Sequence, residues 1–232
     1  MNGISQEGWP LTLTRAFEKF PIANRELHHW LEGADPELAA LIGSCRFPWD
    51  LLAINEHIVG KLEQTEIEGS VHPAAVIEGI ISLGKGSRIL PGVYIEGNVV
   101  IGENCKIGPN CYIRGNTSIG NNCHIGQSVE IKNSLILDRT NVGHLSYVGD
   151  SILGEGVNFG AGTNVSNLRH DGANHRSMTE EGLVDTGRRK FGVIVGDGVH
   201  TGIGTMIYPG RKIWPEMTTL PGAIVERDLR PD

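Results

Sequence analysis

The sequence predicts an all-β fold, a parallel β-helix of hexapeptide repeats with a helical segment at its N-terminus. Every sixth residue from Val71 to Ile131 is aliphatic, small side chains such as Ser87 and Cys105 follow four positions later, and Gly or Asn fills the corners. This six-residue period fits neither an amphipathic helix nor an alternating strand, and it is typical of a solenoid of stacked coils. Because three hexads make one triangular coil, residues eighteen apart should lie over one another at about 4.8 Å.

The repeat fades at Leu137 and Gly143, resumes at Leu153 and recurs from Val195 to Val225. Residues 167–191 fall outside it and form a polar, charged loop. A β-sandwich is the alternative, but it would need alternating runs between irregular turns rather than one register over ten hexads. We therefore expect two parts, a helical cap over residues 1–66 and a β-helix over residues 67–232 that carries an extra loop at 167–191.

The first part carries helix signals. Asp35 suits an N-cap, Pro36 suits the first turn and Gly43 would close the helix. A second helix is predicted from Trp49 to Leu62, with its apolar side chains on one stripe. Since the first coil of a solenoid exposes its core, we expect this segment to cover that coil. A surface for docking a partner is the alternative.

Composition excludes several classes of function. The net charge of −7 and the pI near 5.7 argue against a nucleic-acid partner. No run of eighteen apolar residues and no signal-peptide pattern is present, so we expect a cytoplasmic protein with no membrane partner. Cys105, Cys111 and Cys123 fall at small inward positions and lack ligand spacing, which favours core filling over a metal or redox site.

One outward column carries charge. Glu78, Glu96, Arg114 and Lys132 are spaced by eighteen, each directly after an inward aliphatic residue. We expect Glu96 to pair with Arg114, whereas Arg114 and Lys132 would repel by about 1 kcal/mol even in water at about 5 Å. A bound anion would remove that repulsion, and solvated side chains that splay apart are the alternative.

The segment Asn141 to Asp150 breaks the hexad rule and contains His144 and Tyr147. In a chain this regular, a local break is where a functional site is expected. A lone histidine is more often structural, so this signal is weak by itself.

Larger motifs carry a resemblance to a known family. Arg114, Lys132 and the run from Gly143 to Asp150 are followed by Asn158-Phe159-Gly160-Ala161-Gly162-Thr163 and by Asn167 through Asn174. These segments resemble the acetyltransferase half of glucosamine-1-phosphate acetyltransferase/N-acetylglucosamine-1-phosphate uridyltransferase. Three segments, Pro48 to Leu52, Asn167 to Gly172 and Asp185 to Gly192, resemble still more closely the related sugar-1-phosphate nucleotidylyltransferase/acetyltransferases. The resemblance covers residues 48 to 228, and no Gly-rich nucleotidyltransferase loop precedes it.

The resemblance implies a left-handed β-helix, a homotrimer with sites between subunits, and acetyl-CoA with an amino-sugar 1-phosphate as substrates. It makes His144 the general base. It assigns the phosphate or nucleotide to Arg114 and Lys132, and it assigns the sugar to Tyr147, Asn158 and Asn167.

The coenzyme side departs from the family pattern. The resemblance places Ala161 beside the acetyl-CoA thioester, but Ile203 stands where the family has a hydroxyl residue, Pro221 replaces an alanine, and a C-terminal arginine is missing. We therefore assign Arg188, Arg189 and Lys190 to the phosphates of the coenzyme, with a solvated loop as the alternative.

The sequence thus predicts an N-acetyltransferase for an amino-sugar 1-phosphate such as glucosamine 1-phosphate, toward UDP-N-acetylhexosamine synthesis. A non-catalytic partner of a separate nucleotidyltransferase, binding the sugar phosphate or nucleotide sugar without the coenzyme, is one alternative. The other is a zinc enzyme of the γ-carbonic anhydrase kind, with His144, His170 and His175 as ligands.

Overall fold

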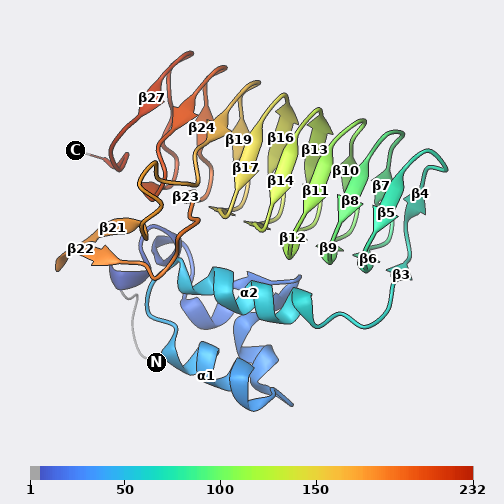
Figure 1. The fold of residues 1–232 in the computed structure, drawn as a ribbon, viewed down its shortest axis with the longest axis horizontal. Helices are drawn as coiled ribbons and strands as arrows, with labels where there is room; N and C mark the ends of the chain where they lie inside the picture. The colour runs from blue at the N-terminus through green and yellow to red at the C-terminus, as the bar shows by residue number, and fades with distance from the viewer. Residues whose placement is uncertain (1–5, 232) are drawn as a thin grey trace.

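A left-handed parallel β-helix forms most of the chain in the computed structural model, which describes residues 6–231 (Figure 1). Its coils form a prism with three flat faces. Within residues 6–231 these faces contain seven, eight and eight strands. The predicted fold class is confirmed.

The strands of each face run parallel and stack in register. The first face consists of β4 (Ser70–Val71), β7 (Arg88–Ile89), β10 (Lys106–Ile107), β13 (His124–Gln127), β16 (Asn141–His144), β19 (Asn158–Phe159) and β24 (His200–Thr201). The second face consists of β5 (Val76–Glu78), β8 (Tyr94–Glu96), β11 (Tyr112–Arg114), β14 (Glu130–Lys132), β17 (Tyr147–Gly149), β20 (Asn164–Val165), β25 (Met206–Ile207) and β27 (Ile224–Val225). The third face consists of β3 (Glu66–Ile67), β6 (Ile81–Leu83), β9 (Val99–Ile101), β12 (Thr117–Ile119), β15 (Leu135–Ile136), β18 (Ile152–Leu153), β23 (Val193–Val195) and β26 (Arg211–Ile213).

Aliphatic side chains from the three faces fill the interior of the prism. Ile95, Ile113 and Ile131 lie over one another in the second face and are fully buried. Cys105 and Cys123 fill the same interior, as their inward positions indicated. Burial at roughly 25 cal/mol per Å² of apolar surface makes these columns the main source of stability.

The third face is apolar on its outer side too. Leu135, Ile152 and Ile194 point away from the prism and are buried against helix α2 (Asp50–Gly60) and its neighbours. Strands covered on both sides read as continuous apolar runs, as Val193 to Val195 does here. The outer side of the third face is therefore an apolar surface that the N-terminal segment covers.

The helical segment lies along the side of the prism and not over its first coil (Figure 1). Helix α1 (Pro36–Ser44) is capped by Asp35, which accepts hydrogen bonds from the N–H groups of Glu37 and Leu38 at 3.0 Å each. Gly43 lies inside this helix and does not close it. The expected cap over the first coil is wrong, because the segment packs instead on the apolar outer side of the third face; the division near residue 66 stays a prediction.

Short elements complete the fold. They are the 3-10 helices η1 (Gln6–Gly8), η2 (Leu11–Leu13), η3 (Phe17–Lys19) and η4 (Leu27–Leu31), the pair β1 (Pro21–Ile22) and β2 (Arg25–Glu26), and the hairpin of β21 (Arg176–Thr179) and β22 (Gly182–Asp185). The hairpin belongs to the loop 167–191, which leaves the prism after β20 and returns before β23. Among residues 6–231, no helix combines the length and the apolar character needed to cross a bilayer.

Candidate functional site

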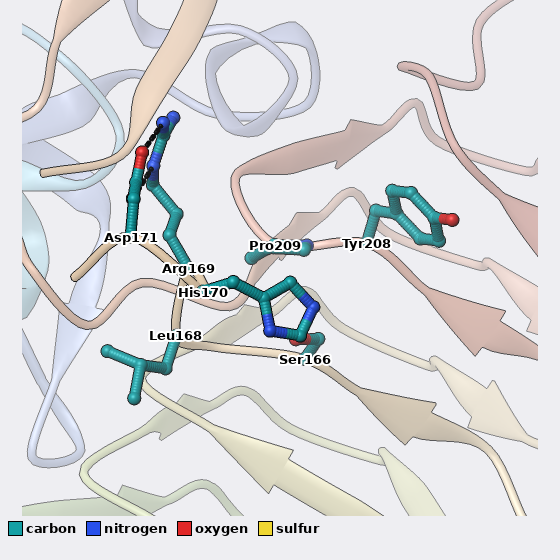
Figure 2. Close-up of a pocket in the computed structure, with 7 residues that line it drawn as sticks. All are labelled: Ser166, Leu168, Arg169, His170, Asp171, Tyr208 and Pro209. Carbon is teal, nitrogen blue, oxygen red and sulfur yellow. Dashed lines mark hydrogen bonds and ion pairs between the residues drawn. The ribbon is translucent and has the colours of Figure 1, made fainter. Parts of the chain in front are cut away.

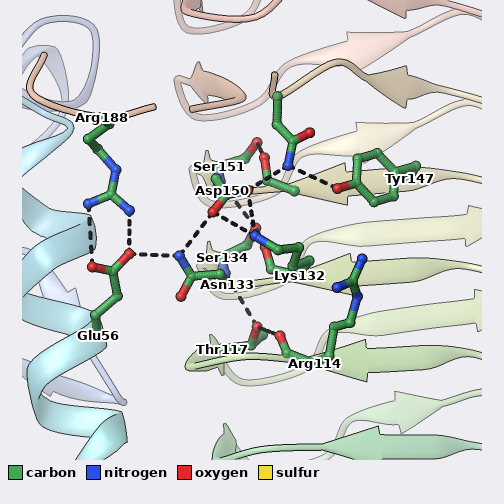
Figure 3. A network of polar contacts seen from close by, with 12 residues as sticks. Glu56, Arg114, Thr117, Lys132, Asn133, Ser134, Tyr147, Asp150, Ser151 and Arg188 are labelled. Carbon is green, nitrogen blue, oxygen red and sulfur yellow. Dashed lines mark hydrogen bonds and ion pairs between the residues drawn. The ribbon is translucent and has the colours of Figure 1, made fainter. Parts of the chain in front are cut away.

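A buried carboxylate organises the corner between the second and third faces (Figure 3). The side chain of Asp150 is 3% exposed and accepts hydrogen bonds from Lys132 Nζ at 2.9 and 2.8 Å. Asn133 Nδ2 donates to it at 3.1 Å and Asn167 Nδ2 at 2.5 Å. A carboxylate with this many donors is well satisfied in spite of its burial. Asp150 thus fixes the positions of two residues that the sequence assigned to substrate, Lys132 and Asn167.

The corner that carries Asp150 has unusual backbone. The stacked corner positions begin with glycines at 79, 97 and 115. They continue with Asn133 (φ 46°) and Asp150 (φ 51°), which, like Gly97 and Gly115, are in the left-handed region. Asn and Asp tolerate this region better than most residues, and they add a polar side chain there. At this height of the prism the glycine column therefore becomes a column of hydrogen-bonding groups.

These two corners are also one residue shorter than the earlier ones. Ser118 pairs with Leu135 and Leu135 with Ile152, a separation of seventeen in place of eighteen. The fading of the hexad therefore begins at the corner after Lys132 and is repeated after Gly149. Sequence reasoning placed the break at Asn141 to Asp150 and missed Asn133 and Asp150 as site residues. The shortened corners and the change from Gly to Asn or Asp were the signals that could have found them.

Tyr147 and Asn167 meet across a glycine. Asn167 Nδ2 also donates to Tyr147 Oη at 2.9 Å. A Cβ at Gly149 would lie 2.4 Å from Tyr147 Oη and 2.7 Å from Asn167 Nδ2, so only glycine allows this contact. Burial, and then the charge of Asp150, raises the pKa of Tyr147, so the phenol keeps its proton. The structure thus brings together Lys132, Tyr147 and Asn167.

Arg114 lies one strand from Lys132 but has a different partner from the one expected. Its guanidinium donates to Glu130 Oε1 through Nε at 2.8 Å and Nη2 at 2.7 Å. Glu96, the expected partner, accepts instead from the hydroxyl of Tyr112. The expected Glu96–Arg114 pair is wrong because the tyrosine occupies that carboxylate. The repulsion argument for an anion also fails, since Arg114 and Lys132 each have a carboxylate of their own.

His144, Ala161 and Ile203 lie on successive coils at the corner between the first and second faces. The Gly162 N–H donates to the His144 carbonyl at 3.0 Å, and the Gly204 N–H donates to the Ala161 carbonyl at 2.8 Å. His144 and Ile203 are exposed, as is Leu145 beside the histidine. His144, Ala161 and Ile203 therefore form one ridge, which we call the His144 ridge.

Asn158 lies away from the other residues assigned to the sugar. It points outward from the first face, where its register partners are Asn141 and His200. Lys132, Tyr147 and Asn167 lie beyond the His144 ridge, on the second face and its far corner. A single prism therefore places Asn158 on a different face from them.

A hollow of about 540 Å³ lies where the loop 167–191 meets the second face (Figure 2). It is lined by Ser166, Leu168, Arg169, His170, Asp171, Tyr208 and Pro209. Continued strand register places Lys132, Gly149, Ser166 and Tyr208 in one column. Two coil steps of about 4.8 Å thus put Ser166 roughly 10 Å from Lys132 along that column.

The three cations of the loop do not act together. Arg188 turns inward, is 17% exposed, and forms an ion pair with Glu56 of α2. Arg189 and Lys190 stay exposed. Arg188, which the sequence assigned to coenzyme phosphates, is therefore occupied within the chain, and the assignment keeps only Arg189 and Lys190.

The histidines of the zinc alternative are also dispersed. His175 is buried, and its Nε2–H donates to the Asn167 carbonyl at 3.1 Å. His170 lies in the exposed wall of the hollow, and His144 lies on the ridge. Among residues 6–231, two groups of three His, Cys, Asp or Glu side chains bring their ligand atoms within 4.8 Å of one another. They are Glu26 with His28 and His29, and Asp35 with Glu37 and His57, and neither contains His144, His170 or His175. The structure thus gives no support to the zinc alternative.

Comparison with known proteins adds relatives. Residues 95–218 match a family model described as the GMPPB C-terminal domain. A bifunctional sugar-1-phosphate nucleotidylyltransferase/acetyltransferase of Sulfurisphaera tokodaii is 40% identical over 182 residues, which are 78% of this chain and 45% of that protein. A bifunctional protein GlmU of Methanococcus maripaludis strain C7 is 43% identical over 228 residues, which are 98% of this chain and 53% of that protein.

This chain thus spans about half the length of the curated relatives it matches. Among solved structures, a UDP-N-acetylglucosamine acyltransferase aligns at 15% identity with a TM-score of 0.29, over 71% of this chain and 66% of that one.

Proposed function

This chain belongs to the family of the GMPPB C-terminal domain, and from that premise we propose that it is an N-acetyltransferase that moves an acetyl group from acetyl-CoA to an amino-sugar 1-phosphate. Glucosamine 1-phosphate is the simplest such acceptor, and its product leads toward UDP-N-acetylhexosamine. Its relatives include a bifunctional sugar-1-phosphate nucleotidylyltransferase/acetyltransferase and bifunctional GlmU proteins.

One observation carries the proposal. Lys132, Tyr147 and Asn167 converge around Asp150, beside an open hollow and on the face next to the His144 ridge. An ammonium, a phenol and an amide are the groups expected to hold a phosphate and the hydroxyls of a sugar. Their shared anchor keeps them in place before substrate arrives, which is what efficient positioning requires.

The phosphate end of the substrate would meet Arg114 and Lys132. Lys132 stays with Asp150, because a carboxylate that is 3% exposed has no solvent to turn into. Glu130 is more exposed and can turn away from Arg114, so the guanidinium can exchange this carboxylate for the phosphate. Binding therefore replaces one ion pair and keeps the other.

The amine end of the sugar would lie at the His144 ridge. His144 would take a proton from the amine as its nitrogen attacks the thioester carbon, and that proton would then leave with the thiol of coenzyme A. An imidazole nitrogen can both accept and donate a proton, which this transfer requires. Exposed apolar side chains of Leu145, Ile203 and Leu220 offer a surface for the pantetheine arm.

A homotrimer would complete the site. Asn158 and the Asp150 cluster face different directions on one prism, and a neighbouring prism packed against the ridge could bring an Asn158 toward the sugar of another copy. Light scattering at micromolar concentration should give three times the mass of the chain. A monomer that still acetylates sugar phosphates would contradict the shared site.

Acetyl transfer to a panel of acceptors tests the function. The panel contains glucosamine 1-phosphate, galactosamine 1-phosphate, glucosamine 6-phosphate and glucosamine, and release of the coenzyme A thiol reports turnover. We expect activity with the 1-phosphates above that with glucosamine, because Arg114 and Lys132 bind the phosphate.

The alternative is a sugar-phosphate-binding partner of a separate nucleotidyltransferase that no longer uses the coenzyme. Ile203 favours it, since an exposed aliphatic side chain stands where the resemblance expects a hydroxyl. Tight binding of glucosamine 1-phosphate in calorimetry with no thiol release would support this alternative. Turnover with any amino-sugar 1-phosphate excludes it.

A further inference from the structure

Helix α2 reaches the substrate site through one side chain, Glu56 (Figure 3). Glu56 Oε1 accepts a hydrogen bond from Asn133 Nδ2 at 2.7 Å. The same amide nitrogen donates to Asp150 Oδ1 at 3.1 Å, so one NH₂ group joins the two carboxylates. A single residue, Asn133, thus links the carboxylate of Glu56 to Asp150, the carboxylate that holds Lys132 and Asn167.

Glu56 also holds the loop 167–191. Its carboxylate is paired with both Nη atoms of Arg188. The Arg188 carbonyl accepts from the His175 N–H at 2.9 Å, and the His175 ring donates to the Asn167 carbonyl at 3.1 Å. A second route therefore runs from Glu56 through Arg188 and His175 to Asn167.

The two routes end on the same residue. One reaches the Asn167 side chain through Asn133 and Asp150, and the other reaches the Asn167 backbone through the loop. Arg188 is 17% exposed and its Nε has no hydrogen-bond partner among residues 6–231. Without Glu56, the Arg188 charge would be buried and unpaired, so the guanidinium would turn to solvent and move the loop.

We propose that Glu56 is a positioning residue of the substrate site, through which helix α2 sets the loop 167–191 and the side chains of Asn167 and Lys132. This inference rests on the proposed function for its kinetic readout. It makes the N-terminal segment a part of the sugar-phosphate site and not only a cover for the third face.

Glu56→Gln tests the proposal with little change in volume. It should raise the KM for the amino-sugar 1-phosphate about 10-fold to 100-fold, the cost of misplacing binding groups by about 1 Å, and leave the KM for acetyl-CoA unchanged. Amide hydrogen exchange at residues 167–171 should become faster, because one of the two anchors of the loop is lost.

Arg15→Met is the matched control. Arg15 is 14% exposed and forms an ion pair with Asp197 at 2.6 Å, which also joins the N-terminal segment to the prism. This contact lies outside the Glu56 network, so the variant should lose stability without a change in sugar-phosphate KM or in exchange at 167–171. The double variant Glu56→Gln/Arg188→Gln removes the stranded charge and keeps the test usable if Glu56→Gln alone misfolds.

The outcomes distinguish a failure of the positioning role of Glu56 from a failure of the proposed function. Equal behaviour of Glu56→Gln and Arg15→Met, in KM and in exchange, would overturn the positioning role. If the parent neither binds nor acetylates any amino-sugar 1-phosphate, the proposed function fails, and the exchange measurement alone then decides whether Glu56 holds the loop.

Discussion

Replacing Asp150 by Asn should damage both the stability and the binding of this protein. The amide keeps the volume of the carboxylate but has one acceptor oxygen, and its NH₂ group faces the donors of Lys132 and Asn167. The Lys132 ammonium, which is 15% exposed, then loses its counter-charge. The variant tests whether the buried carboxylate holds the site together.

The magnitude follows from burial. Removing one partner of a buried ion pair costs about 3–5 kcal/mol, and the partial exposure of Lys132 places this case near the lower end. For a chain of this size each kcal/mol lowers the melting temperature by about 2–4 °C, so about 3 kcal/mol corresponds to about 6–12 °C.

Thermal unfolding and calorimetry with glucosamine 1-phosphate measure the two effects. We expect a lower melting temperature and weaker binding, because Lys132 and Asn167 lose their common anchor. Asp138→Asn is the control, since Asp138 accepts hydrogen bonds from Asn121 at another corner and forms no ion pair with any of residues 6–231. If Asp150→Asn melts and binds like the parent, the carboxylate does not organise the site.

Three further predictions concern the surroundings of the site. Glu130→Gln should tighten binding of glucosamine 1-phosphate in calorimetry, because Arg114 loses a competing carboxylate, and weaker binding would contradict the exchange of partners. Burial lowers the pKa of His175, so its contribution to stability is present above its ordinary value of about 6.5 and is lost as the pH falls. The melting temperature of His175→Gln should thus fall less than that of the parent between pH 7.5 and 5, and equal losses would refute this. Arg189→Ala/Lys190→Ala should abolish a preference for coenzyme A over its 3′-dephospho form, and a parent without that preference ends the assignment.

The architecture could be predicted from the sequence because a six-residue repeat of aliphatic side chains specifies the β-helix. Every inward aliphatic column and the stacking of Arg114 beneath Lys132 follow from counting residues. The helix that begins after Asp35 was also predictable, since its capping side chain acts over two or three residues. Position along the prism is thus a local property of this chain.

The contacts between side chains were less predictable. Arg114 and Glu96 were expected to pair with each other, but Arg114 pairs with Glu130 and Glu96 accepts from Tyr112. Which partner is chosen depends on side-chain reach across neighbouring coils. The role of Asp150 could be recognised only once the structure showed the two shortened corners, which place Asp150 over Asn133. The reach of side chains between neighbouring coils, which the hexad period does not specify, decided where these groups meet.

Glu56 could not be found in this way at all. It lies 77 residues from Asn133 and 132 from Arg188 in sequence, and only the packing of α2 on the third face brings them together. The same packing turned Arg188 inward. Arg188 therefore forms a structural ion pair with Glu56, which the spacing of residues in the sequence could not predict.

The rate of acetyl transfer by His144→Asn, measured beside the parent with glucosamine 1-phosphate and acetyl-CoA, tests the central claim most directly. Asparagine keeps the polarity at the ridge but cannot take a proton, so kcat should fall about 10²-fold to 10⁴-fold while the melting temperature stays that of the parent. Near-parent turnover by His144→Asn would show that His144 is not the base and would contradict the account.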